Sequence, residues 1–221
     1  MQLAAMQRSV PYHASTVLVL LLAIVFPHIG LIPLPFGYTV PVLLAIWWVL
    51  KKYGESFADL GLSVSNFKLG AVGQGLISAV LLFVVFQYVV APVLSNWLGL
   101  PAANLQDFDF IKGNKAGLLF VVLMGWLVGG FYEELVFHGY LFTRIENWLG
   151  GSKAVLLSWL LSNLVFGAYH WQLGWSGAIQ AGLAGLAYHG LVIRNQRNLW
   201  YAFFFHGFYD TIALTALYFE Y

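Results

Sequence analysis

The sequence predicts an all-α fold, a polytopic transmembrane bundle of about seven helices. Of the 221 residues, 61% are hydrophobic and only 9% are charged, whereas an ordinary soluble domain is about 25% charged. The apolar residues also gather into runs of spanning length with short polar segments between them. The length accommodates about seven spans of ~20 residues and no separate soluble domain. Residues 1–221 are therefore expected to form one membrane-embedded domain.

Charge and cysteine content exclude several classes of function. The net charge is +1, and no basic stripe is present of the kind that nucleic acid requires. The chain has no cysteine, which excludes disulfides, thiolate metal sites and cysteine nucleophiles. The expected partners are the lipid bilayer and a peptide or protein substrate, without nucleic acid.

Each apolar run is interpreted as a helix because irregular backbone cannot face lipid. The first run follows Arg8, is longer than a signal-peptide core and lacks a small-x-small cleavage site, which favours a retained helix. The second is short and flanked by proline, so it is expected to be tilted or partly inserted, and the third can kink at Pro92. The runs are Ala14–Ile32, Tyr38–Leu50, Leu69–Leu98, Ala116–Phe142, Ala154–His170, Gly174–Ile193 and Leu199–Phe219.

The connecting segments predict the orientation. Lysine and arginine concentrate in cytoplasmic loops, and most of them fall on one side of the predicted helices. The N-terminus is therefore predicted to be cytoplasmic and the C-terminus outside. The basic segments on the cytoplasmic side are Arg8, Lys51–Lys68, Arg144–Lys153 and Arg194–Arg197. Small residues recur at four-residue spacing, as at Gly125 and Gly129, and favour close helix packing within the chain.

Five ionisable residues lie in long apolar stretches. Glu133 and Glu134 are the only charges between Lys115 and Arg144, and Asp210 is the only charge between Arg197 and Glu220. An ionisable group in hydrocarbon costs several kcal/mol and is by default a functional candidate. The two histidines in similar surroundings are His170 and His206.

Helical spacing pairs these residues with neighbours. Glu134 shares a face with His138, and His206 shares one with Asp210, which can orient the imidazole ring. Two adjacent carboxylates cannot both stay ionised in a low dielectric, which suits a general acid or base. The alternatives are an acid pair at the membrane interface and a structural polar pair between helices. His170, four residues after Phe166, can equally be a histidine of the aromatic belt.

The remaining histidines, His13, His28 and His189, have no acidic neighbour in an apolar run and are interpreted as structural. No serine stands in a GxSxG setting and no HExxH occurs, so ordinary serine-hydrolase and zincin motifs are absent from the sequence.

The motifs resemble the CPBP intramembrane proteases, the family of the Ras-converting CAAX prenyl endopeptidase and bacterial abortive-infection homologues. The family signature is EExxxR, FxxxH and Hxxx(N/D/B) on separate helices, and a DLGL segment is common before the first of them. The resemblance covers about residues 55–215. The matching residues here are Asp59–Leu62, Glu133-Glu134 with His138, Phe166 with His170, and His206 with Asp210.

The resemblance implies an endopeptidase that acts in or near the membrane through glutamate-activated water. It implies Glu133 as the base, with Glu134, His170, His206 and Asp210 as further catalytic residues. It also implies structural support from His138 and Phe166. The substrate implied is a membrane-associated, prenylated or otherwise hydrophobic peptide, and no cofactor is expected.

Two departures from the family pattern leave alternatives open. His138 stands where the family has arginine, so a permanent charge becomes titratable. Asp210 stands where the prenyl protease has asparagine, and an ionised aspartate would repel an oxyanion. Asp210 must then be protonated, orient His206 or bind a metal. A zinc-dependent protease is therefore the first alternative, and its ligands would be Glu133, His170, His206 and Asp210.

Two further alternatives are a non-catalytic membrane scaffold or immunity protein and a proton-coupled transporter. Either enzyme interpretation requires the polar residues of three helices to converge in one cavity. If the helices stood upright in the membrane, a rise of 1.5 Å per residue would place His170 and His206 roughly 10–15 Å apart along the membrane normal. Convergence therefore predicts tilted or shortened helices.

Overall fold

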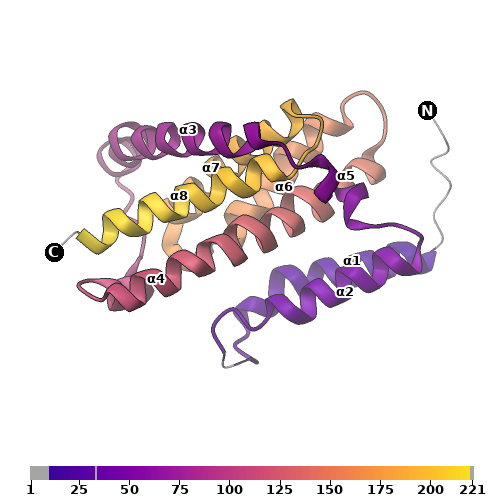
Figure 1. Cartoon of the computed structure of the whole chain (residues 1–221), viewed down its shortest axis with the longest axis horizontal. Coiled ribbons are helices and arrows are strands. Elements are labelled where there is room, and N and C mark those ends of the chain that lie inside the picture. The colour runs from indigo at the N-terminus through magenta and orange to yellow at the C-terminus, as the bar shows by residue number, and fades with distance from the viewer. Residues whose placement is uncertain (1–9, 33, 220–221) are drawn as a thin grey trace.

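All the regular secondary structure in the described part of the chain is helical. The structure is a computed structural model that describes residues 10–32 and 34–219, and this part contains no β-strand. Figure 1 shows the eight α-helices arranged as a bundle. They are α1 Val10–Val25, α2 Thr39–Lys52, α3 Leu69–Val85, α4 Lys115–Met124, α5 Phe142–Leu149, α6 Ala154–Tyr169, α7 Gly174–Arg194 and α8 Trp200–Phe219.

Each predicted apolar run forms a helix, which confirms the all-α fold class. The third run extends beyond α3 through two π-helical turns, Phe86–Val90 and Val93–Trp97, which lie on either side of Pro92. Proline lacks the N–H of a regular turn, and such wider turns are one way in which a helix accommodates the break. The fourth run is a continuous helix of 35 residues, in which the π-helical segment Gly125–Leu141 joins α4 to α5.

Among the described residues, length and composition identify three helices that can cross a membrane, Val10–His28, Leu69–Trp97 and Lys115–Leu149. The helices α6 and α7 meet at an angle of 56° and together qualify as a fourth span. The helix α2 has only 14 residues, which agrees with the predicted short second element. These apolar helices indicate a multi-pass membrane protein.

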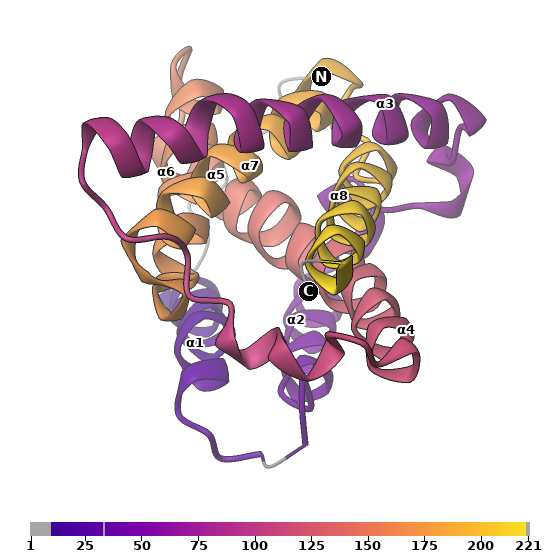
Figure 2. The ribbon, with the colours of Figure 1, turned by 90° about the vertical axis from the view of Figure 1, so that its left-hand side faces the viewer.

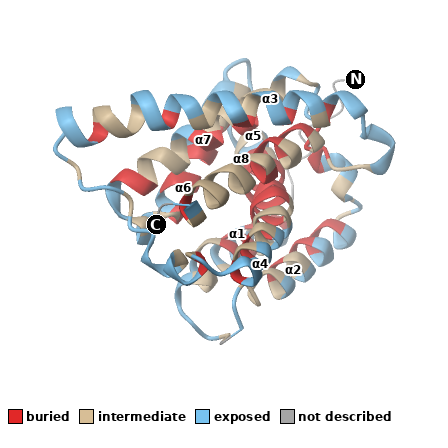
Figure 3. Cartoon of the chain, turned by 60° about the vertical axis from the view of Figure 1, so that its left-hand side comes forward, coloured by how far each residue is buried: buried red, intermediate tan, exposed pale blue. Residues whose placement is uncertain are grey.

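The central helix, Lys115–Leu149, forms the middle of the bundle. Figures 1 and 2 show α3 on one side and the α1–α2 hairpin on the opposite side, with the central helix and α8 between them. The helix α8 packs against both α3 and the π-helical segment, and α6 packs against α7. Figure 3 shows buried residues gathered on the central helix. In contrast, α3 exposes Leu76, Ile77 and Leu81, which suits a lipid-facing surface.

Glycines allow α8 to approach its neighbours closely. A Cβ added at Gly75 of α3 would lie 2.8 Å from the backbone nitrogen of Phe205. A Cβ at Gly129 of the central helix would lie 2.5 Å from Asp210 Oδ2. The small-residue pair Gly125 and Gly129 therefore packs within the chain, as predicted from its spacing.

The α1–α2 hairpin is attached to the central helix by a buried ion pair. Arg144 is only 1% exposed, and its Nη2 lies 2.6 Å from Glu55 Oε2. Arg144 also donates to the Tyr12 hydroxyl of α1. The sequence analysis assigned Arg144 to a cytoplasmic loop, whereas the structure places it inside the helix that continues to Leu149. The carboxylate of Glu55 compensates for the charge and allows the helix to continue.

The Asp59–Leu62 segment contacts the turn that precedes α8, around Arg197 and Leu199. Asp59 closes a capping box with Ser56, and Gly61 has φ 93°. The Gly61 carbonyl accepts a hydrogen bond from the Leu199 N–H at 3.1 Å. A Cβ at Gly61 would lie 2.0 Å from the Arg197 carbonyl oxygen, so both the positive φ and the close approach require glycine.

Candidate active site

Three helices bring the candidate polar residues together. Glu133 and Glu134 lie on the π-helical segment, His170 ends α6, and His206 and Asp210 lie one turn apart on α8. His170 Nε2 lies 3.8 Å from Glu133 Oε2, and His206 Nε2 lies 4.0 Å from the same oxygen. The expected convergence is therefore observed. The bend of 56° between α6 and α7 occurs beside His170.

Glu134 is the buried centre of this cluster. Its side chain is 2% exposed, and its Oε1 lies 2.8 Å from His206 Nδ1. Its other oxygen, Oε2, makes a short hydrogen bond with His138 Nδ1. The predicted pairing of Glu134 with His138 on one helix face is thus present in the structure. Each oxygen of this carboxylate thus has an imidazole partner.

Glu133 lies in different surroundings from its neighbour. Its nearest polar partners, the two imidazole nitrogens, are beyond direct hydrogen-bond distance. The described part of the chain offers it no other side-chain or backbone hydrogen bond. The Glu133 side chain is 10% exposed and that of His170 is 16% exposed, so solvent reaches this side of the cluster. Of the two adjacent glutamates, Glu133 is therefore the more accessible.

The ring of His170 is oriented by its own helix. Its Nδ1 lies 2.8 Å from the Phe166 carbonyl oxygen. Because a carbonyl can only accept, Nδ1 carries the hydrogen and Nε2 faces Glu133. The Phe166 ring packs edge-on against His170 with ring centroids 4.6 Å apart, and against His206 at 6.2 Å. Phe166 thus packs against both imidazoles.

Asp210 lies at the more open edge of the cluster. Its side chain is 25% exposed, and its Oδ1 is 3.6 Å from His206 Nε2. The predicted pairing of His206 and Asp210 on one face is found, although this separation exceeds a direct hydrogen bond. Gly125 and Gly129 face the Asp210 side chain, so a side chain at either position would displace the carboxylate.

Sequence reasoning missed three residues that contact the cluster. Tyr188 of α7 stacks on the His206 ring at 4.5 Å with an interplanar angle of 22°. Asn163 of α6 hydrogen-bonds to His138, and its side chain also faces His189 of α7. The available signal for Asn163 was an amide within an otherwise apolar helix. His189 was interpreted as structural, and its ring lies 4.7 Å from that of His138.

The four residues proposed as zinc ligands do not form a recognisable metal site in the described structure. Across residues 10–32 and 34–219, no group of three or more histidine, aspartate or glutamate side chains is placed so as to hold a metal ion. The Nδ1 atoms of His170 and His206 face a carbonyl and a carboxylate of the protein, and both Nε2 atoms are directed towards Glu133. No step of the mechanism proposed below uses a metal.

Comparison with known families assigns the segment that carries these residues. Residues 115–212 match the model of the type II CAAX prenyl endopeptidase Rce1-like family. The matched segment contains all the candidate residues from Glu133 to Asp210. Comparison with curated proteins and with solved structures found no significant match. The family match confirms the resemblance to the CPBP proteases and supports a CAAX-type intramembrane endopeptidase.

Proposed function

We propose that the protein hydrolyses a peptide bond of a membrane-associated, prenylated or otherwise hydrophobic peptide, with Glu133 as the general base. One observation carries the proposal. The Glu133 carboxylate faces two imidazole nitrogens at 3.8 and 4.0 Å, in the part of the cluster that is accessible to solvent.

These separations suit one shared water molecule. Two hydrogen bonds of about 2.8 Å that meet near a right angle span about 4 Å. A water between Glu133 and His170 would donate one hydrogen to Glu133 Oε2 and the other to His170 Nε2. His170 can accept there because its own hydrogen is directed to the Phe166 carbonyl. Both lone pairs of the water would then be free, one of them for attack.

The reaction then proceeds as a base-catalysed hydrolysis. Glu133 takes a proton from the water, and the oxygen attacks the carbonyl carbon of the scissile amide. The carbonyl oxygen becomes an oxyanion in the tetrahedral intermediate. Glu133 next gives the proton to the amide nitrogen as the C–N bond breaks, which leaves a carboxylic acid and an amine.

His206 is the group placed to meet the oxyanion. With a hydrogen on both nitrogens, its Nδ1 donates to Glu134 and its Nε2 presents a donor towards Glu133 and Asp210. Asp210 orients the ring from the open edge and has no direct contact with substrate in this scheme. Tyr188 limits the ring to one plane by stacking on it. A preorganised donor of this kind is the main source of stabilisation in acyl-transfer sites.

The test is cleavage by the purified protein in detergent and in liposomes. The substrate is a farnesylated peptide with a CAAX ending, and the unprenylated peptide is the comparison. Mass spectrometry of the products locates the cleaved bond. We expect cleavage of the prenylated peptide, loss of cleavage in Glu133→Gln, and no effect of exhaustive chelation.

The alternatives give different results in the same preparation. Activity that chelation removes and zinc restores would favour the metalloprotease. A folded protein that cleaves neither peptide would favour a scaffold. Proton uptake by the liposomes that Glu133→Gln removes, without cleavage, would favour a transporter.

A further inference from the structure

The described structure contains a hydrogen-bonded chain that leads away from the candidate site. It runs from Glu134 through His138 to Asn163, and it ends near His189. All four side chains are buried, with exposed fractions of 0% to 2%. The scheme above uses only Glu134 at the near end, so the remaining groups require a separate explanation.

The orientation of the Asn163 amide follows from a backbone carbonyl. Its Nδ2 lies 2.7 Å from the Trp159 carbonyl oxygen, which can only accept a hydrogen bond. The nitrogen must therefore face Trp159, and Oδ1 must face His138. Asn163 Oδ1 lies 2.8 Å from His138 Nε2. Because Oδ1 has no hydrogen, His138 must carry one on Nε2.

This constraint extends to Glu134 and His206. With Nε2 protonated, His138 either has a second hydrogen on Nδ1 or accepts one there from Glu134. In both cases a single proton lies between His138 Nδ1 and Glu134 Oε2, and Glu134 Oε1 remains an acceptor. The facing nitrogen, His206 Nδ1, must then be the donor.

The opposite arrangement is possible only without Asn163. A neutral His138 with its hydrogen on Nδ1 would let a protonated Glu134 donate through Oε1 to His206 Nδ1. The hydrogen of a neutral His206 would then lie on Nε2, and His206 Nδ1 would have no hydrogen to donate to Glu134. In the present structure this arrangement would set the bare His138 Nε2 against the Asn163 carbonyl oxygen, two acceptors at 2.8 Å.

We propose that Asn163 is a positioning residue that fixes the hydrogen of His138 on Nε2 and so makes Glu134 the acceptor for His206. The proposal rests on the hydrolytic role proposed above for the cluster, but its first test does not. It also gives a reason why histidine is tolerated where the family has arginine. With Asn163 Oδ1 as the acceptor for His138 Nε2, the protonated form of His138 can also donate to Glu134 through Nδ1. An arginine at this position would donate to Glu134 in the same way.

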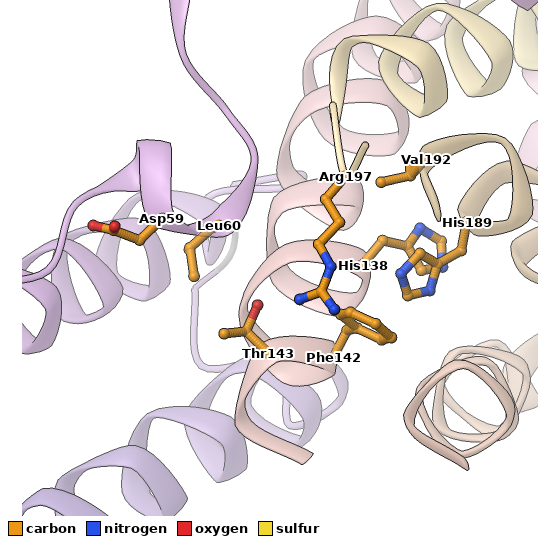
Figure 4. Close-up of a pocket in the computed structure, with 8 residues that line it drawn as sticks. All are labelled: Asp59, Leu60, His138, Phe142, Thr143, His189, Val192 and Arg197. Atoms are coloured by element: carbon orange, nitrogen blue, oxygen red, sulfur yellow. The ribbon is translucent and has the colours of Figure 1, made fainter. Parts of the chain in front are cut away.

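The far end of the chain supports the Asn163 amide. The second hydrogen of its Nδ2 is directed to His189 Nδ1 at 3.5 Å. His189 then carries its own hydrogen on Nε2, for which the described residues provide no partner. A cavity of about 20 Å³ beside the two rings is lined by His138, His189, Thr143 and Arg197 (Figure 4). That volume is enough for one water, which could accept the Nε2 hydrogen.

The first test reads the proton directly. Solid-state nuclear magnetic resonance of protein labelled with ¹⁵N-histidine separates protonated from bare ring nitrogens, and a His138→Gln sample identifies the His138 signals. We expect a protonated Nε2 in the wild type and in Asn163→Asp, which retains an acceptor oxygen. We expect a mixture of tautomers in Asn163→Leu. A bare Nε2 in the wild type would overturn the proposal, even if no variant folds.

The second test is kinetic and uses a neighbouring control. Ser162 lies one residue away, is also buried and also donates to the Trp159 carbonyl, but it makes no hydrogen bond to His138. For the farnesylated peptide we expect Asn163→Leu to lower kcat at least about tenfold with KM within about threefold. Asn163→Asp and Ser162→Ala should stay within about threefold of the wild type. Equal losses in Ser162→Ala and Asn163→Leu would reduce Asn163 to a packing role and refute the proposal.

If the wild type cleaves no peptide, the proposed function fails while the tautomer measurement still decides the positioning role. If the wild type cleaves and the ring spectrum is unchanged in Asn163→Leu, the proposed function stands and this inference fails.

Discussion

Replacing each of the two adjacent glutamates with glutamine should affect activity and stability differently. Glu133 makes no direct hydrogen bond to the described part of the chain, whereas Glu134 is hydrogen-bonded to two buried imidazoles. Glutamine has nearly the shape of glutamate but cannot take up a proton at neutral pH. It also offers one acceptor and one donor in place of two acceptors.

The structure sets the expected magnitudes. Loss of a general base lowers kcat by about 10²- to 10⁴-fold, which is about 3 to 5 kcal/mol of transition-state stabilisation. Glu133→Gln removes no hydrogen bond and relieves the desolvation of a charge, so its thermal midpoint should not fall. Glu134→Gln removes the buried negative charge that compensates the doubly protonated His206, at a cost of about 3 kcal/mol. For a chain of this size, that cost lowers the midpoint by roughly 6–12 °C.

Both variants should be purified side by side and compared with the wild type. Cleavage of the farnesylated peptide gives the activity, and thermal unfolding in the same detergent gives the stability. We expect Glu133→Gln to be stable and inactive. Glu134→Gln should be less stable and also severely impaired, because His206 loses the carboxylate that stabilises its doubly protonated form. Near-normal turnover in Glu133→Gln would refute its role as base, and an unchanged midpoint in Glu134→Gln would refute the assigned network.

Three further predictions concern the edge of the site and the orientation of the chain. Asp210→Asn should keep at least a tenth of wild-type kcat under chelation, because an amide can still hold the His206 ring. Complete loss of activity would indicate that Asp210 is a metal ligand or a necessary acid. Gly129→Ala should lower kcat at least about tenfold, since its methyl group would lie 2.5 Å from Asp210 Oδ2. The control is Gly73→Ala on α3, which has nothing within 4 Å of the added Cβ and should have no effect on peptide cleavage. Equal kcat values in the two variants would contradict the packing argument. Cysteine labelling from either side of the membrane should place the Arg194–Arg197 loop in the cytoplasm and Trp171 outside; the reverse pattern would invert the topology.

The sequence was sufficient for the fold class because helix formation in lipid depends on local composition. Every apolar run became a helix, including the short second run, because backbone groups in lipid must bond within their own segment. The end of the fourth run was less predictable. Arg144 resembled a loop residue, and only Glu55, 89 positions away in sequence, allows its burial. Local sequence patterns therefore give no indication that Arg144 pairs with Glu55.

The candidate site was predictable within each helix and not between helices. The pairs Glu134–His138 and His206–Asp210 followed from four-residue spacing and are found in the structure. The contact between Glu134 and His206 joins residues 72 positions apart, so spacing gives no information about it. Asn163 escaped notice for the same reason, since its partner lies on a different helix.

The π-helical segment changes which residues can serve the site. Successive residues there advance by about 80° around the axis instead of 100°, so adjacent side chains point in more similar directions. Glu133 and Glu134 can thus face the same group of imidazoles from consecutive positions, one towards solvent and the other towards the core. Ordinary α-helical winding over this segment would change the directions of the two acids relative to the histidines of α6 and α8. The winding of this segment is therefore as much a requirement of the chemistry as the identity of its side chains.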